Sequence, residues 1–331
     1  MSKQTVLLLG ATGETGGSIL NGLLEAREAF ASIEVLVRPS SSASAKVDKL
    51  RAQGVKIRVV DIAAPVAELV SSLSGVDILI SAIDAGSQTA QINLATAAKE
   101  AGVKRFVPCA FTTVAPPGGV MALRDSKEEV YQHVRKLFLP HTVIDVGYWH
   151  QISWPRIPSG RVDYALVAVR NPNMEFHAGG DTPNMLTDLR DIGRYVARII
   201  QDPRTLNKAV ATYSDVLSER EIFTMMKEMS GEDIPTKEVT AEEIVASRAR
   251  AVAALAASPQ DYIAQLAAWS EDYKFSKYVR GDNTPAYASY LGYLDASELY
   301  RDFKPITFKA YLEELLGGSV PVPYKERFTA K

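Results

Sequence analysis

Residues 5–17 read TVLLLGATGETGG, a short apolar run followed by glycines spaced three residues apart. The apolar run Thr5–Leu9 is typical of a buried parallel strand, and a segment of helical period follows the glycines. In this context Gly10 permits a sharp turn, Gly13 lets the backbone approach a pyrophosphate, and Gly16 lets the helix pack close to the sheet. The free N–H groups at the start of that helix would face the phosphates. The stretch therefore predicts a dinucleotide-binding site rather than an ordinary glycine-rich turn.

The alternation of short apolar runs and longer amphipathic runs continues through the first half of the chain. Further strands are predicted at Ile33–Val37, Lys56–Val60, Asp77–Ile80, Arg105–Val107 and Thr142–Val146. Helices are predicted between them at Glu14–Ala29, Ala43–Gln53, Pro65–Leu73, Ser87–Ala101 and Asp125–Leu137. Strand–helix alternation implies right-handed crossovers. The predicted fold class is therefore α/β, a Rossmann-type doubly wound parallel sheet with a smaller, mostly helical C-terminal domain.

The pattern changes near residue 150, where prolines break Trp154–Asn184 into loops and short strands. Helical segments are then predicted at Asp188–Gln201, Ser218–Ser230, Ala241–Gln265 with a break at Ser258-Pro259, and Thr307–Leu316, and a returning strand at Lys208–Tyr213. We expect a nucleotide-binding domain over residues 1–153, to which 188–213 returns. A substrate-binding domain is expected over 154–187 and 214–331, with the active site in the crevice between the two domains.

Composition excludes several classes of function. The chain has 331 residues, 37 Lys plus Arg and 39 Asp plus Glu, so its net charge of −2 gives no electrostatic footprint for nucleic acid or an anionic membrane. Cys109 is the single cysteine and the four histidines lie far apart, so we predict no disulfide and no metal site. Without a long apolar run, the expected location is the cytoplasm, as a monomer or homodimer.

The end of the second predicted strand concerns the choice of cofactor. Val35–Val37 is followed by Arg38 and then by Ser40, Ser41 and Ser42. An enzyme that prefers NAD usually places Asp or Glu here, whereas a guanidinium and hydroxyl groups suit the 2′-phosphate of NADP. Arg38 therefore predicts NADP(H), although a solvated arginine at a strand end is the alternative.

Several blocks, in order, resemble the NmrA-like branch of the atypical short-chain dehydrogenases, and within it the isoflavone reductase-like family. That family includes phenylcoumaran benzylic ether reductases and pinoresinol–lariciresinol reductases. The matching blocks cover nearly the whole chain: Gly10–Gly16, Val35–Arg38, Gln88, Ala101–Phe106, Asp191–Gly193, Asp202–Lys208, Gly281–Thr284 and Ala296–Tyr300.

The resemblance implies NADPH on the carboxyl edge of the sheet and catalysis by one lysine. Counting back from Pro140-His141-Thr142 assigns that role to Lys127. The residues expected to hold the cofactor are Gly10, Thr12, Gly13, Glu14, Thr15, Gly16, Arg38, Ser81, Ala82, Ile83, Gln88, Cys109, Ala110, Phe111 and Lys127. The alternative for Lys127 is a surface lysine of a first helical turn, held by Glu128 or Glu129.

The chain departs from the family pattern in two places. Arg135 stands where ordinary short-chain dehydrogenases have the lysine of Tyr-x-x-x-Lys, so that catalytic pair is absent. Cys109–Thr112 replaces the reductases' usual Ser-Glu-Phe-Gly, which leaves open a substrate other than a lignan or isoflavone. The residues expected to line the substrate pocket are Phe111, Tyr148, Trp149, His150 and Trp154, an apolar wall for an aromatic or polycyclic ligand. Packing between domains is the alternative for the aromatic residues among them.

The leading hypothesis is an NADPH-dependent reductase that transfers hydride to a conjugated or benzylic carbon of an aromatic or polycyclic small molecule, with Lys127 moving the proton. The first alternative is a redox-neutral cyclase or isomerase of secondary metabolism with NADP as a scaffold. The second is a non-catalytic NADP-sensing regulator that binds a partner protein. Consumption of NADPH separates the leading hypothesis from both alternatives.

Overall fold

A parallel sheet forms the centre of the N-terminal half in a computed structural model that describes residues 3–167 and 174–325. Its strand order is β3-β2-β1-β4-β5. The strands are β1 (Gln4–Leu9), β2 (Phe30–Val37), β3 (Lys56–Val59), β4 (Ile78–Ser81) and β5 (Arg105–Val107). The order reverses between β1 and β4, and in open α/β sheets ligands bind outside the carboxyl ends of the strands at such a point. The predicted doubly wound α/β fold is confirmed.

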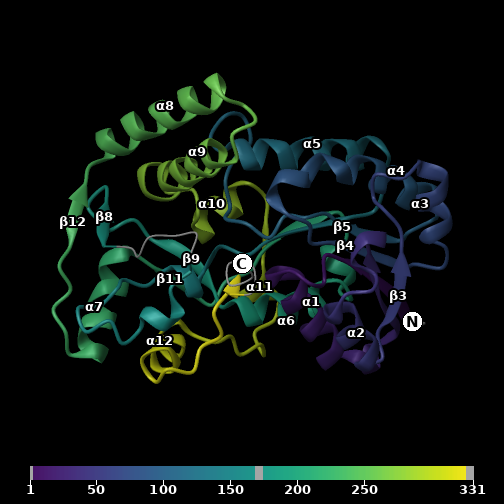
Figure 1. The fold of residues 1–331 in the computed structure, drawn as a ribbon, viewed down its shortest axis with the longest axis horizontal. Coiled ribbons are helices and arrows are strands. Elements are labelled where there is room, and N and C mark those ends of the chain that lie inside the picture. The colour runs from purple at the N-terminus through teal and green to yellow at the C-terminus, as the bar shows by residue number, and fades with distance from the viewer. Residues whose placement is uncertain (1–2, 168–173, 326–331) are drawn as a thin grey trace.

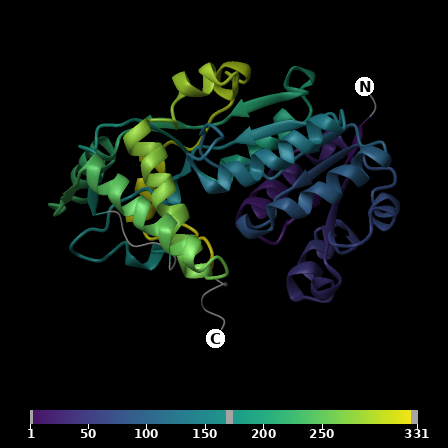
Figure 2. The same ribbon diagram turned by 90° about the horizontal axis from the view of Figure 1, so that it is seen from above.

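Helices cover both faces of this sheet (Figures 1 and 2). Val6 and Leu8 of β1 face one core and Leu7 and Leu9 the other, as the two-residue period of a strand dictates. The helices of this half are α1 (Glu14–Glu25), α2 (Ala45–Ala52), α3 (Val66–Ser72), α4 (Gln91–Glu100) and α5 (Ala122–Lys136). Short 3₁₀ helices lie at Arg27–Ala29, Pro39–Ser41 and Ala85–Ala90. Burial on both faces explains why the central strands β1 and β4 are apolar runs without alternation, whereas the edge strand β3 is partly exposed.

The chain returns to this half after leaving it. β10 (Lys208–Ala211) pairs in parallel with β6 (Thr142–Asp145), and β13 (Leu294–Asp295) pairs with β10. A bridge between Phe106 and His141 connects this group to β5. α6 (Leu189–Ile199) packs against α1. The returning strand predicted over 208–213 is therefore a strand of the structure.

The second lobe combines short strands with helices (Figure 1). Its strands are β7 (Tyr148–Trp149), β8 (Glu175–His177), β9 (Asn184–Thr187), β11 (Asp215–Leu217) and β12 (Lys237–Val239). Its helices are α7 (Glu219–Ser230), α8 (Ala241–Ala257), α9 (Tyr262–Lys274), α10 (Pro285–Tyr290) and α12 (Phe308–Leu316), with 3₁₀ helices at His150–Ile152 and Asp163–Ala165. The short helix α11 (Ala296–Leu299) and the 3₁₀ helix Pro203–Thr205 pack with the first half, beside β13 and β10. The predicted break at Ser258-Pro259 separates α8 from α9, and a π-helical turn, Phe275–Arg280, follows α9. No helix within 3–167 and 174–325 is long and apolar enough to cross a membrane.

Candidate active site

The glycine loop after β1 is built for close approaches. Gly10 has φ of +90°, and a Cβ there would lie 2.2 Å from the carbonyl oxygen of Ala82. A Cβ at Gly16 would lie 2.0 Å from the carbonyl oxygen of Gly10. At Gly13 a Cβ would meet only the Gly10 oxygen, at 3.5 Å, and Gly13 gives α1 no side-chain cap. Two of the glycines are therefore required by the fold, while the third leaves the N-terminus of α1 open to an anion.

The other predicted cofactor residues lie at the same edge of the sheet. Arg38 follows β2, is exposed, and its guanidinium makes no ion pair within the described part of the chain. The remaining positions end or follow β1, β4 and β5 or lie on the helices next to them: Thr12, Glu14, Thr15, Ser81, Ala82, Ile83, Gln88, Cys109, Ala110 and Phe111. The Oγ of Ser81 is buried without a hydrogen-bond partner among residues 3–167 and 174–325. The edge thus combines open backbone with a cation, and these features fit a phosphorylated dinucleotide.

Lys127 lies on the inner face of α5 and is 4% exposed. Its Nζ donates to the carbonyl oxygens of Cys109 at 2.7 Å and Ala110 at 2.9 Å, and to Oε1 of Gln88 at 3.4 Å. The alternative of a surface lysine is therefore wrong, and Glu128 pairs instead with Arg135. Burial lowers the pKa of Lys127, and Arg124 adds to this, while Cys109 and Asp145 oppose it.

The segment that receives Lys127 is itself held in place. Oε1 of Gln91 accepts a hydrogen bond from the Cys109 amide at 2.8 Å, and Nε2 of Gln91 donates to Gln88 at 3.1 Å. The Cys109 thiol donates to the carbonyl of Ile83 at 3.2 Å, which ties the end of β5 to the end of β4. Phe111 adopts φ of +47°, a strained value for a residue with a side chain, so the chain bends sharply after β5.

A buried charged cluster stands behind Lys127. Arg124 donates to Oδ2 of Asp145 at 2.7 Å and to the Tyr293 hydroxyl at 2.9 Å, and that hydroxyl donates to Asp145 at 2.6 Å. Burial disfavours the charge on Arg124, but Asp145 raises the pKa of Arg124 well above its ordinary value. No sequence pattern marks this cluster, because the three residues are far apart in the chain.

The aromatic residues predicted to form one wall are divided in the structure. Tyr148 lines a small cavity of the second lobe, and Trp149 stacks on Tyr324 with ring centroids 6.2 Å apart. The backbone N–H of Tyr324 donates to Glu14 of the glycine loop at 2.8 Å, so Trp149 lies beside the nucleotide edge. His150 is fully buried against Ser214 and Phe308, and Trp154 packs in the core of the second lobe; neither lines the cavity.

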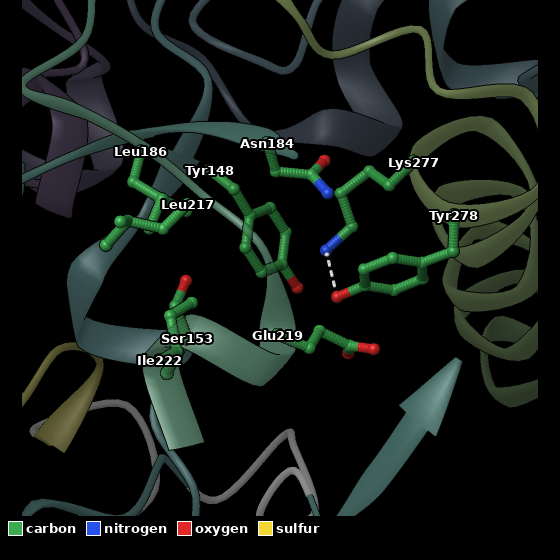
Figure 3. Close-up of a pocket in the computed structure, with 9 residues that line it drawn as sticks. All are labelled: Tyr148, Ser153, Asn184, Leu186, Leu217, Glu219, Ile222, Lys277 and Tyr278. Atoms are coloured by element: carbon green, nitrogen blue, oxygen red, sulfur yellow. Dashed lines mark hydrogen bonds between the residues drawn. The ribbon is translucent and has the colours of Figure 1, made fainter. Parts of the chain in front are cut away.

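The cavity brings together polar residues that sequence reasoning missed (Figure 3). It is lined by Tyr148, Ser153, Asn184, Leu186, Leu217, Glu219, Ile222, Lys277 and Tyr278. Tyr278 falls in a tyrosine-rich segment of the sequence that is also typical of core packing, and no motif marks Lys277. Within residues 3–167 and 174–325, no three His, Cys, Asp or Glu side chains are grouped so that they could hold a metal.

Comparison with known protein families identifies a match: the sequence pattern of the "NmrA-like family" covers residues 2–312 of this chain. The chain belongs to the NmrA-like family. It is 41% identical to an asnovolin J 5′,6′-dehydrogenase of Aspergillus novofumigatus, with 95% of each chain covered. It is 24% identical to a phenylcoumaran benzylic ether reductase of Ginkgo biloba, covering 96% of this chain and all of that one. The chain is an oxidoreductase of this family.

The fold also matches solved structures. The binary complex of leucoanthocyanidin reductase and NADPH from Vitis vinifera superposes with a TM-score of 0.77 at 22% identity, covering 95% of this chain and 99% of the other. The resemblance to the isoflavone reductase-like group is confirmed by relatives named phenylcoumaran benzylic ether reductase, isoflavone reductase and pinoresinol reductase.

Proposed function

We propose that the chain is an NADP(H)-dependent oxidoreductase that transfers hydride between the cofactor and a conjugated or benzylic carbon of an aromatic or polycyclic small molecule, with Lys127 moving the proton. The observation that carries the proposal is the position of the Lys127 amine, buried 2.7 Å from the Cys109 carbonyl at the carboxyl end of β5. A lysine with no function does not require a buried position next to backbone carbonyls, whereas a proton-transfer group beside a nicotinamide requires one that is shielded from water.

The cofactor NADP(H) fits the residues at the sheet edge. Its pyrophosphate would lie over Gly13 and the open N-terminus of α1, and its 2′-phosphate would pair with the exposed Arg38. When bound, the cofactor supplies or accepts the hydride. The leucoanthocyanidin reductase that shares this fold was solved as a binary complex with NADPH, which supports the same cofactor here.

Lys127 would act on the proton through its desolvated amine. Two backbone carbonyls hold Nζ in place, and burial lowers its pKa, so the neutral form is more accessible than in a solvated lysine. The protonated amine would give its proton to the substrate during reduction, and the neutral amine would take it during oxidation. One lysine can therefore serve both directions.

The relatives' names support a small-molecule substrate that changes its oxidation state at carbon, and leave the direction to experiment. One is named as a dehydrogenase acting at positions 5′ and 6′ of asnovolin J, and another as a benzylic ether reductase. Both names describe redox change at carbon. We further propose the domain division of 1–153 with 188–213 for the cofactor, and 154–187 with 214–331 for the substrate, apart from β13 and α11, which pack with the cofactor half.

The test is a measurement of stoichiometry. Purified protein is incubated with NADPH or NADP⁺ and a panel of conjugated aromatic and polycyclic compounds, and nucleotide and product are quantified together. The proposal expects one nucleotide oxidised or reduced per product formed. Turnover without change in the nucleotide would instead support the redox-neutral cyclase or isomerase, and nucleotide binding without any turnover would support the NADP-sensing regulator.

A further inference from the structure

Lys277 lies inside the protein at the wall of the second-lobe cavity (Figure 3). It is 2% exposed, and its Nζ lies 3.4 Å from the centroid of the Tyr148 ring. The same Nζ donates a hydrogen bond to the Tyr278 hydroxyl at 3.0 Å. Burying a lysine is costly, so a lysine that is held at a cavity wall indicates a function for its amine.

The charge of Lys277 is balanced within the site. Glu219 is 3% exposed, and its two oxygens accept hydrogen bonds from the backbone N–H of His177 at 2.7 Å and from Nδ1 of His177 at 2.9 Å. Burial alone would raise the pKa of Glu219, but His177 and the charge of Lys277 lower it, which favours the carboxylate form. A site that already holds one cation and one anion favours a neutral hydrogen-bond acceptor over a second carboxylate.

The remaining wall suits an apolar body. Leu186, Leu217 and Ile222 line the cavity, and Figure 3 shows Leu186 and Leu217 on the opposite side of the Tyr148 ring from Lys277. The His177 ring stacks on Tyr278 with centroids 4.8 Å apart, which fixes the tyrosine hydroxyl. The cavity thus presents donors on one side and hydrocarbon on the other.

Contacts connect this cavity to the strand end that receives Lys127. The Tyr148 ring lies 6.0 Å from the Tyr273 ring, and the Tyr273 hydroxyl is hydrogen-bonded to Thr112 at 2.7 Å. Thr112 lies two residues after Ala110, whose carbonyl accepts from Lys127. The cavity wall and the strand end that receives Lys127 are therefore joined through Tyr273.

We propose that Lys277, assisted by Tyr278, binds a neutral carbonyl oxygen of the substrate, that of a ketone, ester or lactone, while the leucines hold its ring body. This inference rests on the proposed function, since it names the substrate class for that reaction. A hydrogen bond from a buried cation draws electron density onto the carbonyl oxygen, which makes a carbon conjugated to that carbonyl a better hydride acceptor. Lys277 would then be a specificity-determining residue at the end of the site away from Lys127.

The test compares three ligands of similar shape on the full chain loaded with NADP⁺, by calorimetry. They are 4-phenylbutan-2-one (neutral carbonyl), 3-phenylpropanoate (anion) and butylbenzene (no oxygen). The wild-type protein is expected to bind the ketone at least about tenfold more tightly than the other two, as a hydrogen bond to a charged donor allows. Lys277→Met keeps the stem over Tyr148 and should lose the preference, Tyr278→Phe should reduce it in part, and the matched control Lys274→Met should keep it.

Equal or absent binding of the three ligands to the wild type would overturn the inference, as would a ketone preference that survives in Lys277→Met. Preference for the anion would show a carboxylate site instead and also overturn it. The wild-type comparison and Tyr278→Phe keep the test valid if Lys277→Met does not fold. Failure of the proposed function is seen separately, because it appears as no nucleotide turnover while ketone binding remains.

Discussion

Gly22 of α1 and Gly193 of α6 meet where the two helices cross backbone to backbone. A Cβ at Gly22 would lie 2.1 Å from the carbonyl carbon of Gly193, and a Cβ at Gly193 would lie 1.8 Å from the carbonyl oxygen of Ser18. The Ser18 hydroxyl accepts a hydrogen bond from the Gly193 N–H at 3.0 Å and donates to the Leu189 carbonyl at 2.5 Å. α6 is therefore fixed to the helix that carries the glycine loop.

Gly193→Ala is expected to destabilise the protein, because backbone atoms rather than a flexible side chain meet the new methyl group. We expect the free energy of unfolding to fall by about 1–3 kcal/mol, measured by urea denaturation. The control is Gly17→Ala in α1, where a Cβ would lie an ordinary 3.6 Å from the Ala11 carbonyl oxygen. That control should be neutral or stabilising, and equal stability of Gly193→Ala and wild type would contradict the packing described.

The nucleotide-binding half could be predicted from sequence because its signals are local. The central strands β1 and β4 are apolar runs, and a segment of helical period follows each of them. Even so, the predicted helix Glu14–Ala29 ends at Glu25, and the start of the predicted helix Ser87–Ala101 is a 3₁₀ segment. Lys127 is predicted as the proton-transfer residue from the spacing of the family pattern. Its neighbours Glu128 and Glu129 do not indicate this role, but its burial agrees with it.

The second lobe is less predictable for physical reasons. Strands of two to four residues, such as β7 and β9, are too short to show a period. The cavity depends on long-range packing: Lys277 is recognisable only once Tyr148 and Tyr278 are placed beside it. The interpretation of His150 and Trp154 as pocket residues stays a prediction, and both side chains are buried among residues of the second lobe.

Arg38 is expected to set the preference for NADPH over NADH. It is exposed at the end of β2 with no ion pair in the described ranges, so removing it should cost little stability and remove the proposed phosphate contact. In Arg38→Ala we expect NADPH binding to weaken by about tenfold or more, with NADH binding nearly unchanged, by calorimetry.

Two controls accompany this measurement. Arg38→Lys keeps the charge without the planar guanidinium and should fall between wild type and Arg38→Ala. Arg27→Ala removes an arginine that donates to the Gln53 carbonyl before β3, away from the carboxyl edge, and should leave the preference intact. A retained NADPH preference in Arg38→Ala would place the 2′-phosphate contact elsewhere.

Lys127→Met is expected to lower turnover by about 10²–10⁴-fold while NADPH affinity stays within about threefold, since the amine acts on the proton and not on the phosphates. The control is Lys136→Met, an exposed lysine in the last turn of the same helix. Equal loss of nucleotide binding and of turnover would reveal a structural role for Lys127 instead.

The pH profile tests the same residue from its charge. Burial lowers the pKa of Lys127 from its ordinary 10.5. Reduction needs the protonated amine, so its rate should fall as pH rises through this lowered pKa; oxidation needs the neutral amine, so its rate should rise over the same window. Both limbs should vanish from the residual activity of Lys127→Met, and a limb that persists belongs to another group.

Tyr293→Phe is expected to destabilise the protein by about 1–3 kcal/mol, because the Arg124–Asp145 pair then loses a shared hydrogen-bond partner. Arg124→Met should cost more, about 3–5 kcal/mol, since it leaves the Asp145 charge buried and unpaired.

The contribution of Tyr293 to stability depends on pH. Burial and Asp145 raise the pKa of Tyr293, so its contribution to the free energy of unfolding is complete below the ordinary tyrosine pKa of 10.0 and is lost as the pH rises above it. Unfolding curves at neutral pH and above pH 10 should therefore show the difference between wild type and Tyr293→Phe shrinking at alkaline pH. The control is Tyr290→Phe, at an 81% exposed position, which should be as stable as wild type at both pH values. A Tyr293→Phe protein as stable as wild type at neutral pH would contradict the prediction, because it would mean that water replaces the hydroxyl at no cost.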